Sequence, residues 1–505
     1  MPRFYALTLA ALYLALVVFA SAFSYLKIES LGAQAGQGID YSYFLQFYAH
    51  GLSPDSIAEP QHFPGVGTGM FLRGPDGRDS IQKGIHFEPV KYAVAVLYAV
   101  SRSPFFIYIV LIAVFYSPLL YGAWLLRRTV PQPTLVFFVV LLYALSPAAL
   151  PQAVAELRAF TFVYPLYFMA ALAVLLRRAA WERLVLLNLL LATREEMLLL
   201  SVPLIIYEYL TERAERIPHR VSALMAWSWA AWVALAAIYF YYIRASYQLS
   251  FTQPTGTIGR VMHFCLTNPF ALSVEACAAL VFFVFIVPRF WKKYIGADMR
   301  RIAACVFVVG SLVPVCESLV AASPSFWPPS FVFNRFGYMI ALVCLASLVA
   351  VAQIKPFPKR WVIWIGSAAL VFFLVFQSVG HASVFAALTT MHSQISEAQL
   401  VRDARKNTPA SQPIIADART MQAFYDFTHV SVLVPQPAYA VANPQDYYPG
   451  SLDHLADIVH ADGPVTIVIQ RSLAPDIAAV AAAAGKTLSV REENDLYIWY
   501  QTDGK

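Results

Sequence analysis

The chain of 505 residues is 59% hydrophobic and only 13% charged, and its formal net charge is +6. Soluble domains carry about twice that share of charged residues, so the composition excludes an ordinary soluble protein. The sequence has no nucleic-acid-binding motif, and its basic residues are better explained by insertion into a membrane.

Uncharged apolar runs follow one another along the chain. Seven of them are long enough, or nearly so, to cross a hydrocarbon core of about 30 Å: 4–26, 103–126, 129–155, 159–176, 221–243, 336–354 and 361–380. Two further helices are expected over about 262–288 and 300–320, and two shorter pieces lie at 184–193 and 197–207. We therefore predict a mainly α-helical, polytopic membrane protein with about 11 transmembrane helices.

The Lys and Arg residues between the runs gather in every second gap. These gaps hold Arg3, Arg127, Arg128, Arg177, Arg178, Arg183, Arg213, Arg216, Arg220, Arg289, Lys292, Lys293, Arg300, Arg301, Lys355, Lys359 and Arg360. By the positive-inside rule, these gaps and the N-terminus are cytoplasmic. The predicted location is the inner (plasma) membrane. Cleavage after Ala20-Ser21-Ala22, as in a signal peptide, is an alternative that leaves the later topology unchanged.

The two shorter pieces are separated by Arg194, Glu195 and Glu196. They form either one helix with three charges at its middle or two half-length helices that meet at a charged apex on the outer side. A single crossing would move every later basic gap to the outside, so the topology favours two helices. With eleven crossings, everything after residue 380 is extracytoplasmic.

Two polar regions complete the expected organisation. Residues 1–380 form the transmembrane domain, including a first extracytoplasmic loop at 27–91, which ends in an amphiphilic stretch (89–100) suited to the membrane interface. Residues 381–505 carry an excess of acidic residues and predict a small extracytoplasmic α/β domain that binds or braces. Its expected strands cover 413–416, 430–434, 465–469, 487–491 and 496–500, and its expected helices cover 418–426, 451–460 and 474–484.

Ionisable residues near the outer ends of these runs are the candidate functional groups, because charges near hydrocarbon are costly. Asp40 follows the first run, where its carboxylate is placed either to take a proton from an acceptor hydroxyl or to cap a helix over 41–50. His86 and Glu88 share one face of an extended segment, as an acid/base pair, a metal-ligand pair or a hydrogen-bonded turn. A divalent metal ion is left open, since two ligands are weak evidence for one.

Arg194 is the most specific cation among the candidates, because an arginine forks two hydrogen bonds to a phosphate or a carboxylate. A self-neutralising ion pair with Glu195 and Glu196 is the alternative. Glu156 and Arg158 carry the same ambiguity. Arg244 and Arg335 lie near the outer ends of later helices, where they are further candidates for an anionic substrate.

The order of these motifs resembles the DUF2079 family of predicted membrane proteins, whose architecture is similar to the GT-C class of polyprenyl-phosphate-dependent glycosyltransferases. The matching elements are Asp40 and Gln46, Gly51, His86–Pro89, Leu145–Pro147, Arg194–Glu196 and an outer C-terminal domain. They cover most of residues 1–210 by motif and the rest by layout. The chain departs from the family pattern at Ile85, usually Asp, at Arg194, usually Lys, and in having "AELRAF" where a His-Pro-Glu element is usual.

The resemblance implies a glycosyltransferase of class EC 2.4. Its donor would be a polyprenyl-phosphate-linked sugar, with Asp40 as general base and the donor phosphate held by Arg194, aided by Arg335 or Arg244. The sugar would pass with inversion to a glycan, lipid or protein acceptor at the surface of the membrane lipid. Two other readings stay open: a transporter or flippase, and a noncatalytic scaffold. The scaffold predicts that Asp40, His86 and Arg194 are scattered in space.

Overall fold

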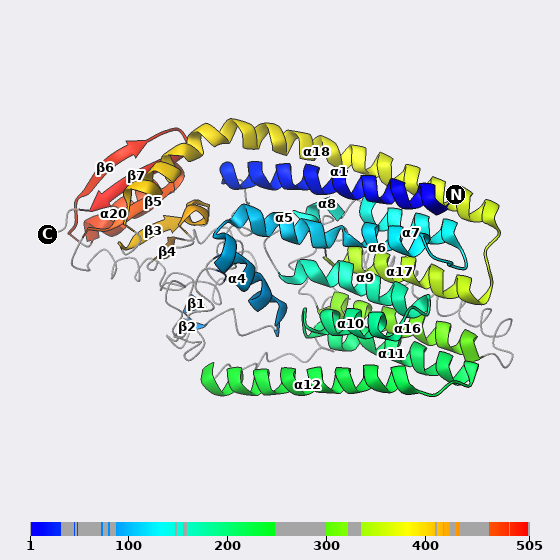
Figure 1. The fold of residues 1–505 in the computed structure, drawn as a ribbon. Coiled ribbons are helices and arrows are strands. Elements are labelled where there is room, and N and C mark those ends of the chain that lie inside the picture. Colours follow the sequence, from blue (N-terminus) through cyan, green and yellow to red (C-terminus); the bar gives the residue numbers. More distant parts are fainter. Residues whose placement is uncertain are drawn as a thin grey trace, which may run out of the picture.

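The structure is a computed structural model. It describes residues 2–31, 87–146, 149–154, 159–247, 299–321, 335–409, 412–417, 419–424, 430–433, 464–483 and 485–502, together with Leu45, Tyr48, 72–73 and 79–80. The chain is mainly helical, with a small sheet at the C-terminal end (Figure 1).

The helical part is a bundle whose elements succeed one another in the expected order. It comprises α1 (Pro2–Glu29), α4 (Val90–Ser101), α5 (Pro104–Phe115), α6 (Ser117–Leu126), α7 (Pro133–Leu145), α8 (Ala149–Ala153), the 3-10 turn η2 (Ala159–Phe162), α9 (Val163–Leu175), α10 (Ala180–Leu191), α11 (Glu196–Glu215), α12 (Arg220–Tyr247), α16 (Met299–Ala321), α17 (Arg335–Ile354) and α18 (Lys359–Asn407). In the first loop, β1 (Leu72–Arg73) pairs antiparallel with β2 (Asp79–Ser80). The run expected over 262–288 lies outside the described residues.

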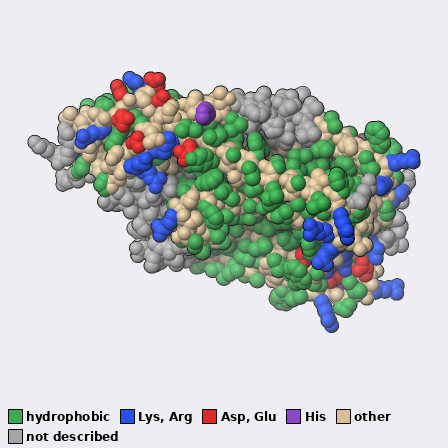
Figure 2. Space-filling model, turned by 45° about the horizontal axis from the view of Figure 1, so that its top comes forward, with side chains coloured by type: hydrophobic (Ala, Val, Ile, Leu, Met, Phe, Trp, Pro, Cys, Tyr) green, Lys and Arg blue, Asp and Glu red, His purple; other side chains and the backbone are tan. Residues whose placement is uncertain are grey.

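Three helices in the described part of the chain are long and apolar enough to cross a membrane by length and composition. They are Pro2–Glu29, Pro104–Leu126, which joins α5 and α6, and Arg220–Tyr239. Shorter apolar helices include α4, α7 and α9. The number of crossings, eleven, therefore stays a prediction. On the face drawn in Figure 2, hydrophobic side chains form a continuous band between two ends where charged side chains gather, as expected for a protein embedded in lipid.

Prolines break two of the runs that were expected to be continuous. The run 103–126 is divided at Tyr116, two residues before Pro118, and the run 129–155 ends as α7 at Leu145 and resumes as α8. Ser146 takes an extended ψ of 139°, as is usual for the residue before a proline. Proline lacks an N–H and disfavours the helical conformation in the residue before it, and Ser146 is extended, so the expectation of one helix over 129–155 was wrong.

The charged hairpin consists of two antiparallel helices, α10 and α11, joined at residues 192–195. Arg183, near the start of α10, contacts Glu208 in the second half of α11, which fixes the antiparallel arrangement. The division into two helices is therefore confirmed for these residues, but the expectation that both are of half length is wrong for α11, which has 20 residues. Helix α11 extends to Glu215 rather than ending near Tyr207, because its later carboxylates are paired with arginines.

A five-stranded sheet forms the core of the C-terminal part. Its strands are β3 (Ile414–Asp417), β4 (Val430–Leu433), β5 (Thr466–Gln470), β6 (Leu488–Glu493) and β7 (Tyr497–Thr502), in the order β4-β3-β5-β7-β6. Strand β3 pairs parallel with β4 and β5, whereas β7 pairs antiparallel with β5 and β6. The five predicted strands are confirmed. The helix expected at 474–484 is α20 (Ala474–Ala483), the one expected at 418–426 is only the short 3-10 turn η6 (Thr420–Ala423), and 451–460 lies outside the described residues.

One helix connects the bundle to the sheet without interruption. Helix α18 runs for 49 residues beside α1, and its last turns pack on the sheet (Figure 1). The boundary expected between 380 and 381 therefore falls inside a helix, and the division into two domains stays a prediction. Below, "C-terminal domain" means the sheet, η6, η8 (Arg471–Leu473), α20 and the last turns of α18.

Candidate functional site

The structure describes four of the candidate residues with their side chains: Glu88, Arg194, Glu195 and Glu196. Asp40, His86, Glu156 and Arg158 lie outside the described residues. Arg244 and Arg335 are placed only by their backbone, in the last turn of α12 and at the first residue of α17. The side-chain geometry of the predicted site can therefore be described only for the first four residues.

The segment before α4 is bound to the turn of the α10–α11 hairpin. The backbone N–H of Val90 donates to the carbonyl oxygen of Ala192 at 3.0 Å, and the N–H of Phe87 donates to Oε2 of Glu195 at 2.9 Å. The first N–H groups and the last carbonyl groups of a helix have no intrahelical partners, so the start of α4 and the end of α10 here supply partners to each other. Two motifs that are far apart in the sequence thus meet at one place.

Ionic contacts join the same two segments. Nε of Arg194 lies 2.8 Å from Oε2 of Glu196 and 3.9 Å from Oε1 of Glu88, and the side chains of Arg194 and Glu88 are only 12% and 8% exposed. We call Glu88, Lys91, Arg194, Glu195 and Glu196 the apex cluster. The ion pair considered as an alternative for Arg194 is present, but it includes Glu88 as well as a neighbour in sequence.

Lys91 was not singled out from the sequence, although it is a basic residue in an apolar stretch. It is 5% exposed and is the second residue of α4, within electrostatic range of Glu88 and Glu195. Burial lowers the pKa of Lys91, and the two carboxylates act in the opposite direction. The apex cluster thus combines three carboxylates with two buried or half-buried basic groups.

Lys27 is a second buried lysine that the sequence analysis did not identify. Its Nζ donates to the carbonyl oxygen of Val154 at 3.1 Å, which joins the last turn of α1 to the end of α8. Val154 directly precedes the segment that contains Glu156 and Arg158. A lysine at the end of an apolar run usually extends its ammonium group toward the membrane interface, so nothing in the sequence indicated that Lys27 joins α1 to the end of α8.

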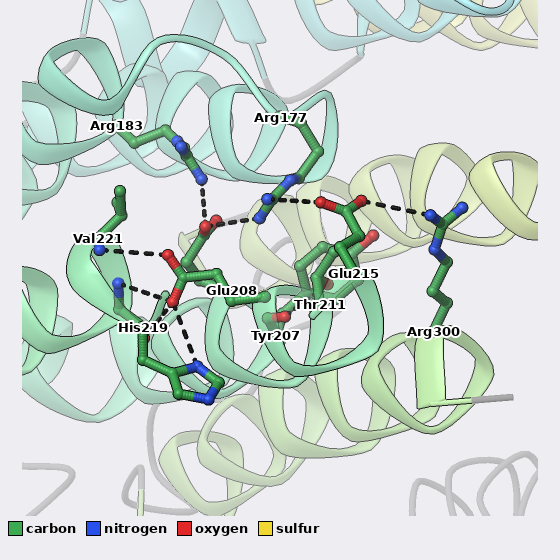
Figure 3. Close-up of polar contacts among 11 residues, drawn as sticks. Arg177, Arg183, Tyr207, Glu208, Thr211, Glu215, His219, Val221 and Arg300 are labelled. Carbon is green, nitrogen blue, oxygen red and sulfur yellow. Dashed lines mark hydrogen bonds and ion pairs between the residues drawn. The ribbon is translucent and has the colours of Figure 1, made fainter. Parts of the chain in front are cut away.

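A second group of charges occupies the opposite end of α11 (Figure 3). We call Arg177, Arg183, Glu208, Glu215 and Arg300 the base cluster. Glu208 is fully buried and pairs with Arg183 and, at 2.6 Å, with Arg177; Glu215 lies 3.0 Å from Arg177 and 3.4 Å from Arg300.

The base cluster is bordered by a helix cap. Glu212 accepts hydrogen bonds from the backbone N–H groups of Val221, at 3.2 Å, and Ser222, at 3.4 Å, and so caps the start of α12. Together these contacts fasten the ends of α9, α10, α11, α12 and α16. Because every carboxylate here is already engaged by described partners, the base cluster is best explained as a structural clamp.

The two clusters are separated by an uncharged stretch of helix. Glu196 and Glu208 are twelve residues apart on α11, about 18 Å along its axis, and Glu215 lies about 29 Å from Glu196. Polar groups placed at the two ends of such a helix match the two surfaces of a hydrocarbon core. The basic helix ends of α6, α9, α11 and α17 gather at the base end, opposite the C-terminal sheet (Figure 1).

The apex cluster has the groups needed to bind an anion and to exchange protons. Arg194 offers a planar set of donors suited to phosphate, and the carboxylates offer acceptors for hydroxyl groups. Among the described residues, no group of three or more His, Cys, Asp or Glu is arranged to hold a metal ion. A divalent ion stays an open prediction, since His86 lies outside that part of the chain.

An apolar cavity lies between α7 and α17. Its volume is about 240 Å³, and its walls are Leu142, Tyr143, Ser146, Tyr338, Ala341, Leu342, Cys344, Leu345 and Leu348. Tyr338 lies one turn after Arg335, and its hydroxyl donates to the carbonyl oxygen of Tyr143 at 2.9 Å. The cavity therefore lies one turn along α17 from the backbone of Arg335, and its walls are mainly hydrophobic.

Comparison with known proteins gives a likeness in layout only. No family model and no curated protein matches the sequence, so the DUF2079 resemblance stays a prediction. Crystal structures of ArnT from Cupriavidus metallidurans, bound to undecaprenyl phosphate and in the apo state, each resemble the chain with a TM-score of 0.49 and 12% identity, covering 97% of both chains. An Archaeoglobus fulgidus oligosaccharyltransferase in complex with Zn and sulfate has a TM-score of 0.35 and 13% identity, covering 92% of this chain and 69% of the other. At this level of similarity, the chemistry has to be inferred from the chain's own residues.

Proposed function

We propose that the chain is an integral membrane glycosyltransferase of the GT-C type. It transfers a sugar from a polyprenyl-phosphate donor to an extracytoplasmic acceptor, with inversion at the anomeric carbon. The observation that carries the proposal is the meeting of Glu88, from the His-Phe-Glu-Pro element, with Arg194, from the hairpin. These are two of the elements by which the sequence resembles the DUF2079 family, and a scaffold has no need to bring them together.

Arg194 binds the donor phosphate in this proposal. A polyprenyl-phosphate sugar is a phosphodiester with one negative charge, and the departing polyprenyl phosphate carries two as the bond to the sugar breaks. A cation beside the leaving oxygen therefore stabilises the transition state more than the ground state. Without donor, Glu196 and Glu88 share the guanidinium of Arg194, and the phosphate takes their place or joins them.

Asp40 is the general base. Its carboxylate takes the proton of the acceptor hydroxyl as that oxygen forms a bond to the anomeric carbon, and the electron pair of the breaking bond leaves with the phosphate. His86 and Glu88 assist at the same place by orienting hydroxyl groups of the sugar or the acceptor. Glu156 and Arg158, which follow the carbonyl held by Lys27, complete the substrate-binding set with Glu195, Arg244 and Arg335.

The isoprenoid chain of the donor occupies the apolar cavity between α7 and α17. Six of the nine lining residues are Leu, Ala or Cys, and two more are tyrosines. An isoprenoid gains free energy by exchanging lipid or water contacts for such walls. A cavity one turn along α17 from the backbone of Arg335 suits a molecule with an anionic head and an apolar tail. We assign the apex end to the extracytoplasmic side, because the basic helix ends gather at the base end.

The test is sugar transfer by the purified chain in proteoliposomes. Polyprenyl-phosphate-linked sugars are supplied as donors, and release of polyprenyl phosphate is measured for the wild type and for Asp40→Asn. The proposal expects release by the wild type and loss of it in a folded Asp40→Asn variant. Release by both at the same rate would remove Asp40 from the mechanism, and no release from any donor would count against the proposed function.

A transporter or flippase is the second candidate, and the interrupted helices favour it. Discontinuous helices such as α7–α8 and α10–α11 are typical of transporter binding sites, which lie near the middle of the membrane. The apex cluster instead lies at one end of α11. Counterflow of labelled substrate in vesicles without release of polyprenyl phosphate would favour the transporter.

A further inference from the structure

The last turn of α1 ends inside the core of the C-terminal domain. Leu31 is 4% exposed and has a left-handed φ of 50°, which turns the chain out of the helix. It belongs to the same hydrophobic cluster as Val401 on α18, Phe424 after η6 and Tyr497 on β7. A residue from the start of the chain thus completes a core that otherwise comes from its last quarter.

Arg402 of α18 holds the end of α1 from one side. One of its Nη atoms donates to the backbone carbonyl oxygen of Glu29 and lies 3.4 Å from the carboxylate of the same residue. Carbonyl groups in the last turn of a helix lack intrahelical partners, and basic side chains often satisfy them. Here the basic group comes from a different element.

Arg419 holds the end of α1 from the other side. Its Nε donates to the carbonyl oxygen of Leu31 at 2.9 Å, and another nitrogen of the same guanidinium donates to Oε1 of Gln394 on α18. The group also lies 5.9 Å from the centre of the Tyr497 ring. One side chain therefore joins α1, α18 and the sheet.

Asp417 shapes the turn that aims Arg419. It is the last residue of β3, and its Oδ1 accepts hydrogen bonds from the backbone N–H groups of Arg419 at 2.6 Å and Thr420 at 3.0 Å. Its other oxygen accepts from the N–H of Gln470, at the end of β5. Asp417 and Gln470 thus mark the carboxyl edge of two parallel strands, which is where open α/β sheets usually bind ligands.

We infer that the carboxyl edge of the C-terminal sheet is the receptor for the last turn of α1, and that Arg402 and Arg419 are positioning residues which set where the chain leaves that helix. In the part of the C-terminal domain that the structure describes, this edge is occupied by the end of α1, so the domain acts as a brace for that helix. Lys27, in the same part of α1, is held by Val154 of the bundle, so this end of α1 is fixed from both sides. The inference does not depend on the proposed reaction.

Hydrogen–deuterium exchange in proteoliposomes tests the brace. Arg402→Ala places a good helix former on α18, so the helix is retained. The expected result is exchange about tenfold faster at Ser30 and Leu31, whose amides bond to Leu26 and Ile28. The matched control is Lys406→Ala, which removes the same charge from the same helix at a residue that pairs only locally with Asp403. Exchange in Arg402→Ala equal to that in the control would overturn the inference.

Arg419→Ala provides a second variant, with exchange of β5 and β7 as its folding control. Intact strands with faster exchange at Leu31 support the inference, and intact strands with unchanged exchange overturn it. If the strands exchange faster as well, the Arg402→Ala result decides.

Once sugar transfer has been measured, Arg402→Ala is expected to lower kcat at an unchanged KM for the donor, and a kcat equal to that of Lys406→Ala would contradict the positioning role. Absence of transfer in the wild type would remove only the proposed function, because the exchange test does not use it.

Discussion

The backbone N–H of Phe87 donates to Oε2 of Glu195 at 2.9 Å, although the two residues are separated by 108 positions in the sequence. This bond places the start of α4 against the turn between α10 and α11. Glu88 is the next residue after Phe87 and Arg194 the residue before Glu195, so the bond also sets the distance between the two charged groups on which the proposed function rests.

Replacing Glu195 tests the role of this bond. Glu195→Gln keeps a side-chain oxygen that accepts from Phe87, whereas Glu195→Ala leaves that N–H without its partner, at a cost of about 1.5–3 kcal/mol. We expect faster hydrogen exchange at the start of α4 in the Ala variant and little change in the Gln variant. Equal exchange in both variants would show that the bond does not hold α4 in place.

Replacing Arg194 tests the proposed phosphate site. We expect Arg194→Ala to weaken binding of polyprenyl phosphate by about 10- to 100-fold, because a charge-assisted, forked contact is lost. Arg194→Lys keeps the charge without the fork and should bind with intermediate affinity. Binding is measured by titration in nanodiscs, with Arg213→Ala, an exposed arginine near the other end of α11, as control. An affinity in Arg194→Ala that matches the control would exclude this role.

The apolar cavity predicts a dependence on donor chain length. Ala341→Trp fills part of the space between α7 and α17. We expect a higher KM for donors with long isoprenoid chains and an unchanged KM for short-chain donors, which do not extend into the cavity. Steady-state kinetics with two donors that differ only in chain length make the comparison, and a KM raised equally for both would place the chain elsewhere.

The base cluster predicts a loss of stability. Glu208→Ala leaves Arg177 and Arg183 without their shared counter-charge in a buried place, at a cost of about 3–5 kcal/mol. Glu215→Ala removes a half-buried carboxylate and should cost about 1 kcal/mol or less. Denaturant unfolding of the two variants in the same detergent gives the comparison. Equal losses would argue against a structural clamp centred on Glu208.

Asp417 predicts a pH dependence of stability. Burial, the largest cause, raises its pKa above 3.8, while the hydrogen bonds from Gln470, Thr420 and Arg419 act against that rise. The folded state therefore holds this proton at pH values where the unfolded state has lost it. The contribution of Asp417 to the free energy of unfolding is largest below pH 3.8, falls as the pH rises through the folded pKa, and is constant above it.

Asp417→Asn removes this titration and replaces a carboxylate that accepts from several donors, so it should lower stability by about 1–3 kcal/mol at neutral pH. The difference in unfolding free energy between wild type and variant, measured from pH 3 to pH 7, checks the direction of the pH dependence and the size of the stability loss. The difference is expected to grow as the pH falls through the folded pKa, and a difference that shrinks towards pH 3 would contradict the assigned direction.

Much of the fold can be predicted from patterns within short stretches of sequence. Apolar runs predicted α1, α12, α16 and α17, and short apolar runs predicted β3, β4 and β5 of the C-terminal sheet. The last two strands, β6 and β7, were predicted as a final pair. The break at Ser146 was missed, although Pro147 supplies the signal for it, because hydropathy alone does not register the lost backbone hydrogen bond.

The candidate site is harder to predict, because its contacts join segments that are distant in sequence. Charge and spacing identified Glu88 and Arg194 separately, but only the fold shows that they face each other. Lys91 lies in the stretch 89–100 that is expected at the membrane interface, and its burial depends on how α4 packs against the hairpin. The docking of Leu31 into the C-terminal domain leaves no local signal at all, since one leucine after a helix is unremarkable by itself.

The central claim is that the apex cluster holds the phosphate of a polyprenyl-linked sugar during transfer. The most direct measurement is the rate of polyprenyl phosphate release in proteoliposomes by wild type, Arg194→Ala and the control Arg213→Ala. We predict release by wild type and control, and a rate that is lower by a factor of about 100 or more in a folded Arg194→Ala variant. Equal rates in all three proteins would contradict the account.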